Sequence, residues 1–351
     1  MLDTLKRIGA IAFLFIAGIL VFLSGLILFR PKPEITANVL STNIAEMNAT
    51  QENLLAENRQ HEIDLSWTEK LKNDGQNRIN FLLLGRGGEN HESGELTDTI
   101  MVASFSPLQN KLKLISIPRD LYIKMPERNY FTRINAIKNK KDLEGKSGIT
   151  YLEETIKQIS GIDIHYYASF DFSDFKDLID ELGGIDLFFE EPVSDTSFPA
   201  NEIGDHEYFY IPAGENHING STALKIVRSR HSYWGDFDRI DRQQKVISAI
   251  WEKVSAPATG RIDGFLKYFN MWNYARKNIE TDIGTMETLK LLDTFKASQD
   301  LAISTFTISS KPNGELKNAR IKTNNGIAMV LLPKDATFET IRERVKNFLE
   351  E

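Results

Sequence analysis

Apolar residues along this chain fall into short runs separated by glycine-, proline- and asparagine-rich segments. The run Ile79–Leu84 is almost continuous and ends at Gly85, a pattern typical of a strand that is buried on both faces. The runs Thr99–Phe105 and Lys113–Ile117 are separated by SPLQN, a turn-like composition, and therefore predict a β-hairpin.

Segments with helical spacing of their apolar residues alternate with the strands. Ile149–Ile159 predicts a helix that ends before Gly161, and Phe172–Leu182 predicts a second helix, closed by a Gly-Gly pair. Further helices are predicted at Gly220–Arg230, Asp238–Val254, Phe265–Lys277, Met286–Ser298 and Phe338–Leu349, and further strands at Tyr166–Phe170, Ile185–Phe189, Leu301–Ile308 and Ile327–Leu332. This alternation indicates an α/β fold, arranged as an α-β-α sandwich with a mixed central sheet.

One segment near the N-terminus is long, apolar and uncharged. Ile8–Phe29 has 22 residues, and a helix of that length spans roughly 33 Å, enough to cross the hydrocarbon core of a bilayer. A cleaved signal peptide is the alternative, but its apolar region would be shorter, about 7–15 residues, and followed by a small-x-small cleavage site. We therefore expect an uncleaved transmembrane helix over residues 8–29.

The expected anchor divides the chain into four parts. Residues 1–7 form a short basic head, expected in the cytoplasm, because a large domain after a single N-terminal span usually lies outside. Residues 30–76 begin with a Pro-Lys-Pro sequence and continue polar, so they predict a partly helical stalk. Residues 77–351 are then expected to form one extracytoplasmic domain.

Composition excludes several kinds of site. The net charge of −7 argues against a general nucleic-acid binder, which would carry a basic stripe. The chain has no cysteine, so disulfides, thiolate metal sites and a cysteine nucleophile are all excluded. Any anion site must therefore be a local cluster of basic residues on an acidic background.

A glycine-rich loop follows the first predicted strand. Its sequence, GRGGENHESG, lets a ligand approach the backbone closely, and Glu89, His91, Glu92 and Asp98 could provide metal ligands. A flexible surface loop is an equally simple interpretation. Another candidate follows the third predicted strand, where Arg119 either binds phosphate or only pairs with a carboxylate such as Asp120.

The third candidate is a group of four arginines with no lysine among them, Arg228, Arg230, Arg239 and Arg242. Arginine is favoured where phosphate is bound in a planar, bidentate way. If Asp238 caps a helix, Arg239 and Gln243 project together near the helix N-terminus, which also favours an anion. The alternative, a lattice of salt bridges with neighbouring aspartates, fits Arg242 well. For the group as a whole, the pattern favours phosphate binding.

The order and wording of these segments resemble the LytR-CpsA-Psr family of cell-wall ligases. The similar blocks run from about residue 80 to 251: NFLLLG, LTDTIMVASFSP, KLISIPRDLYIKMP, RINA, LIDELGGIDLFF, IPAGENHINGSTALKIVRSRH and GDFDRIDRQQKVI. The resemblance implies transfer of a phosphoglycan from a polyprenyl-pyrophosphate carrier to a peptidoglycan hydroxyl. It also implies an apolar cleft for the polyprenyl chain, with a pyrophosphate and a divalent ion, Mg²⁺ or Mn²⁺, at its mouth.

The family's site residues carry over at six positions. Asp98 matches a metal-binding aspartate, and the residues that match the pyrophosphate-binding set are Arg119, Arg228, Arg230, Arg239 and Gln243. An acceptor hydroxyl must also lose its proton, for which Asp98 and Asp120 are both candidates. One position departs from the family: Gly87 stands where a second metal-binding aspartate is usual. Either Glu89 or His91 then completes the metal site, His91 suiting manganese or zinc better than magnesium, or the ion binds more weakly, or the enzyme works without it.

These residues are compatible with three hypotheses about the activity. The first is the transferase, a membrane protein that takes a lipid-linked glycan and a peptidoglycan acceptor as partners. The second is a non-catalytic, membrane-bound binder or regulator, which the lost aspartate would fit. The third is a hydrolase that cleaves the pyrophosphate with water. Several phenylalanines between residues 170 and 189 could line a lipid cleft, or could simply belong to the core.

Overall fold

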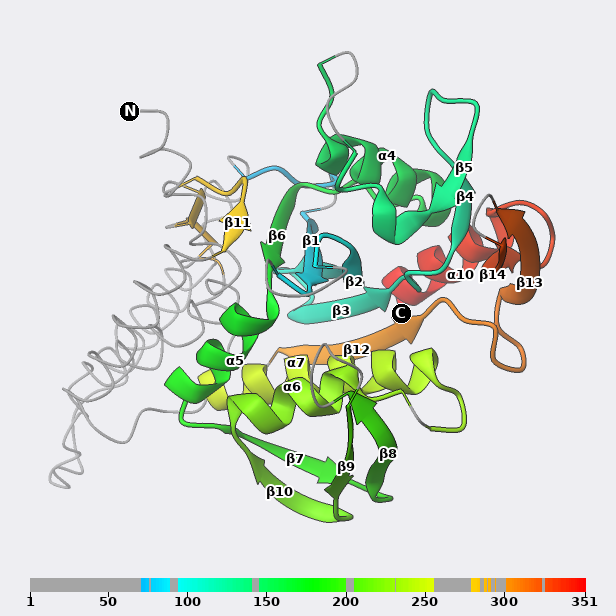
Figure 1. Cartoon of the computed structure of the whole chain (residues 1–351). Helices are drawn as coiled ribbons and strands as arrows, with labels where there is room; N and C mark the ends of the chain where they lie inside the picture. The colour runs from blue at the N-terminus through cyan, green and yellow to red at the C-terminus, as the bar shows by residue number, and fades with distance from the viewer. Residues whose placement is uncertain are drawn as a thin grey trace, which may run out of the picture.

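A six-stranded mixed sheet forms the centre of the folded part of the chain (Figure 1). The computed structural model describes residues 71–351 apart from positions 76, 89–93, 141–144, 200–204, 231, 256–278, 285–286, 289, 292–293, 295–300 and 324–325. The strands follow the order β11 (Glu280–Thr281), β6 (Tyr166–Phe170), β1 (Ile79–Arg86), β2 (Thr97–Ser106), β3 (Lys111–Ser116) and β12 (Ala302–Thr307). The predicted hairpin is β2–β3, and β1 pairs antiparallel with β2 but parallel with β6.

Alternate residues of the central strands face two separate cores. Phe81 and Leu83 of β1 pack into one core, while Leu82 and Leu84 pack into the other, and all four are almost fully buried. Because successive side chains of a strand point to opposite faces, a continuous apolar run is what a sheet covered on both sides requires.

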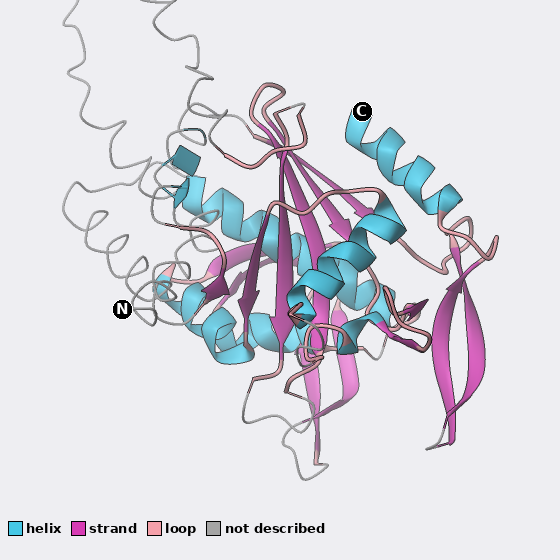
Figure 2. Ribbon diagram, turned by 90° about the horizontal axis from the view of Figure 1, so that it is seen from above, coloured by secondary structure: helices cyan, strands magenta, loops and turns pink. Residues whose placement is uncertain are grey.

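Helices cover both faces of the sheet (Figures 1 and 2). Helices α4 (Gly148–Ser160) and α10 (Glu339–Glu350) pack into the second of these cores. The other face is covered by α5 (Phe172–Glu181), α6 (Gly220–Arg228) and α7 (Asp236–Ser255). The expected α/β fold with a mixed central sheet is therefore confirmed.

Local sequence signals explain several of the helix ends. The Ser147 side chain caps α4, and the helix stops at Gly161, which adopts the left-handed conformation with φ 78°. Asp171 and Asp174 form a capping box at the start of α5. The Asn219 side chain accepts a hydrogen bond from the Thr222 N–H at the start of α6.

Four two-stranded sheets surround the central six-stranded sheet, and most of their strands were not predicted from the sequence. They are β4 (Tyr122–Lys124) with β5 (Phe131–Arg133), β7 (Ile185–Phe189) with β10 (Gly214–Ile218), β8 (Val193–Pro199) with β9 (His206–Ile211), and β13 (Leu316–Thr323) with β14 (Gly326–Pro333). A 3-10 turn, η3 (Ile134–Ala136), follows β5. No element was predicted between residues 189 and 220, where the structure has three strands, β8, β9 and β10. In Figure 2 the β13–β14 hairpin stands out from the body beside α10.

Two predicted boundaries differ from the structure. Helix α7 begins at Asp236, and Asp238 does not cap it: its carboxylate accepts a hydrogen bond from the preceding Trp234 N–H at 2.9 Å. The folded part also extends back to Leu71, which was assigned to the stalk but is buried in the core. A single apolar residue in a polar stretch carries no periodic signal, so its burial could not be predicted.

Some predictions lie outside the described residues. The predicted helix at 265–277 and most of that at 286–298 belong to this group, as does the predicted anchor at 8–29. Within the part of the chain that the structure describes, no helix has both the length and the apolar character needed to cross a membrane.

A candidate anion site at the edge of the sheet

Three segments that are distant in sequence meet where β3 ends and α7 begins, on the right-hand side of Figure 1. Asp98 is the second residue of β2, Arg119 follows β3 in a turn, and Arg239 lies in the first turns of α7. Arg119 Nη1 donates to Asp98 Oδ1, and Arg239 Nη2 donates to the Asp98 backbone carbonyl at 3.1 Å. Asp98 is therefore contacted by two arginines from two different elements.

Asp236, the first residue of α7, links three arginines. Its Oδ2 accepts a hydrogen bond from Arg239 Nη2 at 3.0 Å. Its Oδ1 lies 3.6 Å from Arg119 Nε and 3.7 Å from Arg230 Nε. From the sequence, Asp236 was expected only as one of the aspartates of a salt-bridge lattice. Its position between arginines of three segments, the turn after β3, the loop after α6 and α7 itself, was not predicted.

Asp120 and Arg133 extend the group toward β5. Arg133 Nε lies 3.3 Å from Asp120 Oδ1, and Arg133 Nη2 donates to the Met329 carbonyl of β14 at 2.7 Å. Arg119 Nε lies 3.9 Å from the other Asp120 oxygen. Arg133 was not predicted as a site residue, although it is the first residue of the family-like RINA block.

Arg228, the last residue of α6, stacks on aromatic rings. Its guanidinium carbon lies 4.7 Å from the centre of the Phe172 ring and 5.6 Å from that of Phe198. A guanidinium that lies flat on a ring keeps its N–H edge available for a ligand. We call the group of Arg119, Arg133, Arg228, Arg230 and Arg239, with Asp98, Asp120 and Asp236, the arginine cluster.

Burial and mutual repulsion act on the charges of the cluster. Burial, together with the Arg119 and Arg230 charges, lowers the pKa of Arg239 to about 10, against the pull of Asp236. Burial and the Arg119 charge likewise lower the pKa of Arg230, and burial and the Arg230 charge lower that of Arg228. Arg119 differs, because Asp98, Asp236 and Asp120 together raise its pKa although burial lowers it.

The cluster therefore carries an excess of positive charge. Its described members are five guanidiniums and three carboxylates, a formal balance of plus two. Only 2% of Arg239 is exposed, and among the described residues the Nε atoms of Arg119 and Arg239 have no hydrogen-bond partner. Buried donors normally have partners, so an anion that accepts from these groups would satisfy both the donors and the charge.

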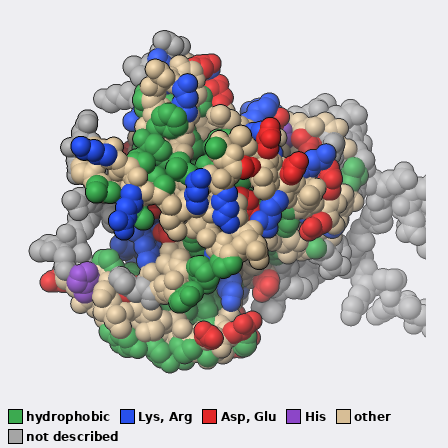
Figure 3. Space-filling view, turned by 90° about the vertical axis from the view of Figure 1, so that its right-hand side faces the viewer, with side chains coloured by type: hydrophobic (Ala, Val, Ile, Leu, Met, Phe, Trp, Pro, Cys, Tyr) green, Lys and Arg blue, Asp and Glu red, His purple; other side chains and the backbone are tan. Residues whose placement is uncertain are grey.

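The face of the molecule on the right-hand side of Figure 1 carries mixed charge. Figure 3 views the molecule from the right-hand side of Figure 1 and shows lysine and arginine side chains gathered on this face, with acidic side chains among them. The arginine cluster thus provides the local basic site that an acidic chain requires for an anion.

Gln243 and Arg242 bind to backbone rather than to the cluster. Arg242 donates to the carbonyls of Ile226 and Ser229 at 3.0 and 2.6 Å, and thereby holds the end of α6 against α7. Arg242 is therefore held by backbone carbonyls and not by the predicted salt bridges with neighbouring aspartates. Gln243 Nε2 donates to the Val227 carbonyl at 3.3 Å. Its predicted role in pyrophosphate binding stays a prediction.

The described residues fit a divalent cation only in part. Asp98 can supply one carboxylate, but no group of three metal-binding side chains occurs among the residues that the structure describes. Glu89 and His91, the predicted additional ligands, lie outside those residues. Magnesium accepts one or two carboxylates and completes its shell with water and phosphate oxygens, so Asp98 alone is compatible with an ion that arrives with a phosphorylated ligand.

The phenylalanines proposed for a lipid cleft have different environments. Phe189 is buried in the core, and Phe170 and Phe175 pack against it with their ring centres 6.4 Å apart. Phe188 is 55% exposed, and Phe172 supports Arg228. The core interpretation holds for Phe189.

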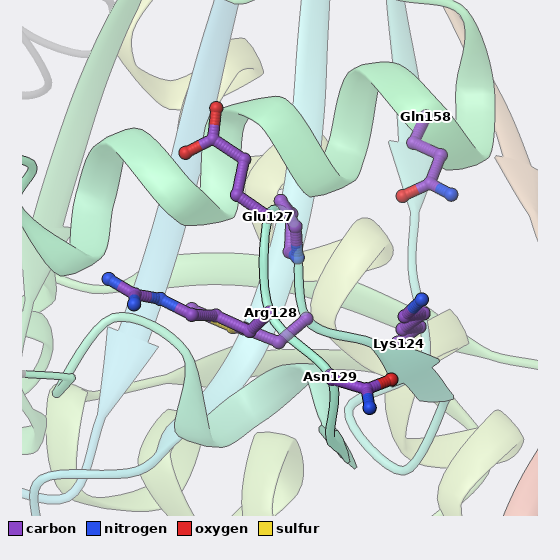
Figure 4. A pocket seen from close by; sticks show the side chains of 7 residues that line it. Lys124, Glu127, Arg128, Asn129 and Gln158 are labelled. Atoms are coloured by element: carbon purple, nitrogen blue, oxygen red, sulfur yellow. The ribbon is translucent and has the colours of Figure 1, made fainter.

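A separate hollow of about 570 Å³ lies between the β4–β5 turn and α4 (Figure 4). Two of its charged side chains already have partners: Glu127 binds Lys146 at 2.8 Å, and Arg128 donates to the Tyr151 hydroxyl at 3.1 Å. None of its lining residues belongs to the arginine cluster. The cluster, and not this hollow, is the candidate functional site.

Comparisons with known proteins identify the family of this chain. The model of the LytR_cpsA_psr family matches residues 38–346. The polyisoprenyl-teichoic acid–peptidoglycan teichoic acid transferase TagV of Bacillus subtilis (strain 168) is 30% identical over 219 residues, 61% of this chain and 51% of TagV. The regulatory protein MsrR of Staphylococcus aureus (strain COL) is 28% identical over 291 residues, 80% of this chain and 76% of MsrR.

A solved structure shows the same fold. The crystal structure of B. subtilis TagV superposes with a TM-score of 0.58 at 25% identity, covering 78% of this chain and 97% of that one. The matched part of this chain spans only about half the length of the full TagV sequence.

Proposed function

The chain belongs to the LytR_cpsA_psr family, and from this membership and the arginine cluster we propose a phosphotransferase that attaches a glycan to the cell wall. The donor is a glycan joined to a polyprenyl carrier through a pyrophosphate. A hydroxyl of peptidoglycan attacks the phosphorus that bears the glycan, a P–O bond forms, and polyprenyl phosphate leaves. The name of the TagV relative, a teichoic acid transferase, supports this class of donor and acceptor.

The observation that carries the proposal is the excess of guanidinium groups at the junction of β2, the turn after β3 and α7. Phosphoryl transfer needs positioning and neutralisation of developing charge more than a covalent catalyst. Arg119 and Arg239, whose Nε atoms donate no hydrogen bond among the described residues, are suited to the pyrophosphate oxygens. Arg228 and Arg230 approach from the end of α6, so the anion would be contacted from several sides.

The acceptor hydroxyl must lose a proton, and we assign the proton acceptor to Asp120. Asp98 is already hydrogen-bonded to Arg119. The Asp120 carboxylate has only longer contacts, 3.3 and 3.9 Å, and 30% of its side chain is exposed, so an incoming hydroxyl can reach it.

A divalent cation is part of the proposal. Bound with the substrate, it would help to neutralise the pyrophosphate, and Asp98 is the described residue that would hold it. The arginines supply positive charge at the same place, which is consistent with the loss of one metal-binding aspartate at Gly87.

The test uses the full chain in detergent with a synthetic polyprenyl-pyrophosphate glycan, with and without soluble peptidoglycan fragments. We expect release of polyprenyl phosphate together with glycan attached to the fragments. Equal release without fragments would identify a hydrolase. Saturable donor binding without turnover would identify the binder or regulator, the role that the name of MsrR suggests for that relative.

A further inference from the structure

An exposed pair of aromatic rings stands beside the arginine cluster. Tyr233 and Trp234 lie in the loop between Arg230 and Asp236, both of which are cluster members. Tyr233 is 90% exposed and Trp234 is 39% exposed, and their rings meet edge to face with centroids 5.0 Å apart. The two rings therefore present apolar surface to solvent at the edge of the candidate anion site.

The loop that carries the pair is held by backbone hydrogen bonds. The Trp234 N–H donates to Asp238 Oδ2 at 2.9 Å, and the Gly235 N–H donates to the Ser232 carbonyl at 3.0 Å. Gly235 has a φ of 56°, which glycine adopts without strain. The Trp234 carbonyl accepts from the Phe237 N–H at 3.2 Å as α7 begins. These bonds fix the direction in which the rings leave the loop.

Two carboxylates, Asp238 and Asp241, follow the rings on the first turns of α7, and the Asp238 carboxylate accepts a hydrogen bond from the Trp234 N–H. Asp238 and Asp241 are both close to Lys311, at 3.9 and 2.7 Å. Apolar rings with carboxylate and ammonium groups beside them suit a pyranose, whose C–H face packs on an aromatic ring while its hydroxyls form hydrogen bonds. The carboxylates oppose an alternative ligand, the anionic surface of a membrane.

We propose that Tyr233 and Trp234 bind a sugar ring of the acceptor, the glycan strand of peptidoglycan. This inference rests on the proposed function, because that function makes a peptidoglycan hydroxyl the acceptor. The donor phosphates belong among the buried guanidiniums such as Arg239, whereas Tyr233 is one of the most exposed large side chains of the described residues. A second substrate that approaches from solvent can therefore contact the exposed Tyr233 ring.

The test compares Tyr233→Ala and Trp234→Ala with the wild type, using the full chain in detergent. The substitutions leave the hydrogen bonds of the loop in place, since these involve backbone atoms and Asp238. We expect the KM for soluble peptidoglycan fragments to rise about tenfold in each variant, while kcat and the donor KM stay within about twofold. Tyr233→Phe, which keeps the ring, should stay close to the wild type.

Direct binding gives a readout that does not depend on turnover. A soluble peptidoglycan tetrasaccharide without lipid should show saturation-transfer NMR signals with the wild type and lose most of them with Trp234→Ala. The matched control is the double variant Tyr208→Ala/Tyr210→Ala. These tyrosines are 64% and 48% exposed and stack at 6.1 Å, but they lie on the face of β9 opposite the buried Phe209, so their removal should change neither readout.

Other results would assign the two rings to a different ligand. A higher donor KM with an unchanged acceptor KM would overturn the proposal and assign the rings to the donor glycan. Weaker binding to vesicles that contain phosphatidylglycerol, an anionic lipid, with both KM values unchanged, would overturn it in favour of a membrane contact. Failure of the wild type to bind the tetrasaccharide would also overturn it. If the wild type binds the tetrasaccharide through the rings but transfers nothing, the proposed function fails and the glycan-binding surface stands.

Discussion

Arg239 shows how one residue of the cluster depends on several others. Its side chain is 2% exposed and is held by Asp236 and by the backbone carbonyl of Asp98, so it links α7 to β2. A buried guanidinium with one carboxylate partner is suited to a second anion, because removing a charge from water is unfavourable unless the charge is paired.

We therefore expect Arg239→Lys to slow transfer although it keeps the charge. Lysine has no planar fork and cannot donate to Asp236, the Asp98 carbonyl and a phosphate oxygen in the same geometry. Loss of a charge-assisted hydrogen bond in a dry site corresponds to about 2–4 kcal/mol, or roughly thirty- to a thousandfold in rate. The measurement is the rate of polyprenyl phosphate release.

Arg342→Lys is the control for this substitution. Arg342 lies on α10, where it donates to the Gln158 carbonyl at 2.8 Å, away from the cluster. The control should keep the wild-type rate, and both variants should melt within a few degrees of the wild type. Full activity of Arg239→Lys would remove Arg239 from the proposed site.

Asp98 gives a second prediction at the same scale, on the divalent cation. Its carboxylate neutralises Arg119 and is the described residue that we propose as a metal ligand. We expect chelation by excess EDTA to abolish transfer and Mg²⁺ to restore it, and Asp98→Asn to raise the Mg²⁺ concentration needed for half-maximal activity at least tenfold.

Glu89→Gln tests whether the glycine-rich loop contributes a ligand. In the Asp98→Asn background it should lower activity further if Glu89 reaches the ion. Unchanged turnover of the wild type in EDTA would leave neutralisation of the pyrophosphate to the arginines alone.

At the scale of elements, the sequence predicted the parts whose pattern is local. Strand β1 is a continuous apolar run, α4 has helical spacing between Ser147 and Gly161, and the β2–β3 hairpin has a clear turn. Strands β8 and β9 were missed because their pairing, which includes Val193 with Ile211, leaves one face exposed and tolerates polar residues. Such strands are specified by their partners, which a local pattern does not contain.

The candidate site was predicted in residue type but not in its contacts. Arginines in a short segment pointed to phosphate, and the family resemblance selected Arg119 and Asp98. The central position of Asp236, and the closeness of Arg133 to Asp120, depend on how β5, the turn after β3 and α7 meet. Arg242 has the residue type of a ligand, but its position on the helix turns it toward the end of α6.

Packing of α4 against its neighbours gives a prediction about pH. Burial of Glu153, with the nearby Asp282 charge, raises its pKa from 4.5 to about 7. The folded protein therefore holds a proton that the unfolded chain releases between these two values. The free energy of unfolding should fall as pH rises through this window. The loss of stability caused by ionising the buried Glu153 should be complete above about pH 8.

Glu153→Gln removes this penalty. We expect the variant to be more stable than the wild type by about 1–3 kcal/mol at pH 8 and by little at pH 4. Thermal or urea unfolding of the full chain at both pH values measures the difference. Glu181→Gln, on an exposed residue at the end of α5, controls for the loss of one acidic charge. An equal gain at pH 4 and pH 8 would contradict the assignment to Glu153.

At the scale of the whole molecule, the proposed reaction requires the cluster to meet a lipid-linked donor. A polyprenyl carrier stays in the bilayer, so its pyrophosphate lies at the membrane surface. The uncharged segment Ile8–Phe29 would keep the domain at this surface, and residues 30–70 would set the distance between them. The acidic net charge of −7 gives little attraction to anionic lipid, so an anchor is the more direct means of association.

This arrangement predicts the topology of the chain in a bacterial cell. A reporter active only in the cytoplasm should be inactive when fused after Glu351 and active when fused to the N-terminus, because residues 1–7 are expected inside and residues from about 31 outside. A reporter active only outside the cytoplasm should give the reverse pattern. An N-terminal tag should stay on the membrane-bound protein, since the apolar run of 22 residues is longer than that of a signal peptide and is followed by Arg-Pro-Lys-Pro instead of a small-x-small cleavage site. Release of an untagged domain into the medium would show that the segment is a cleaved signal peptide, and cytoplasmic activity of the fusion after Glu351 would place the arginine cluster on the wrong side of the membrane for peptidoglycan.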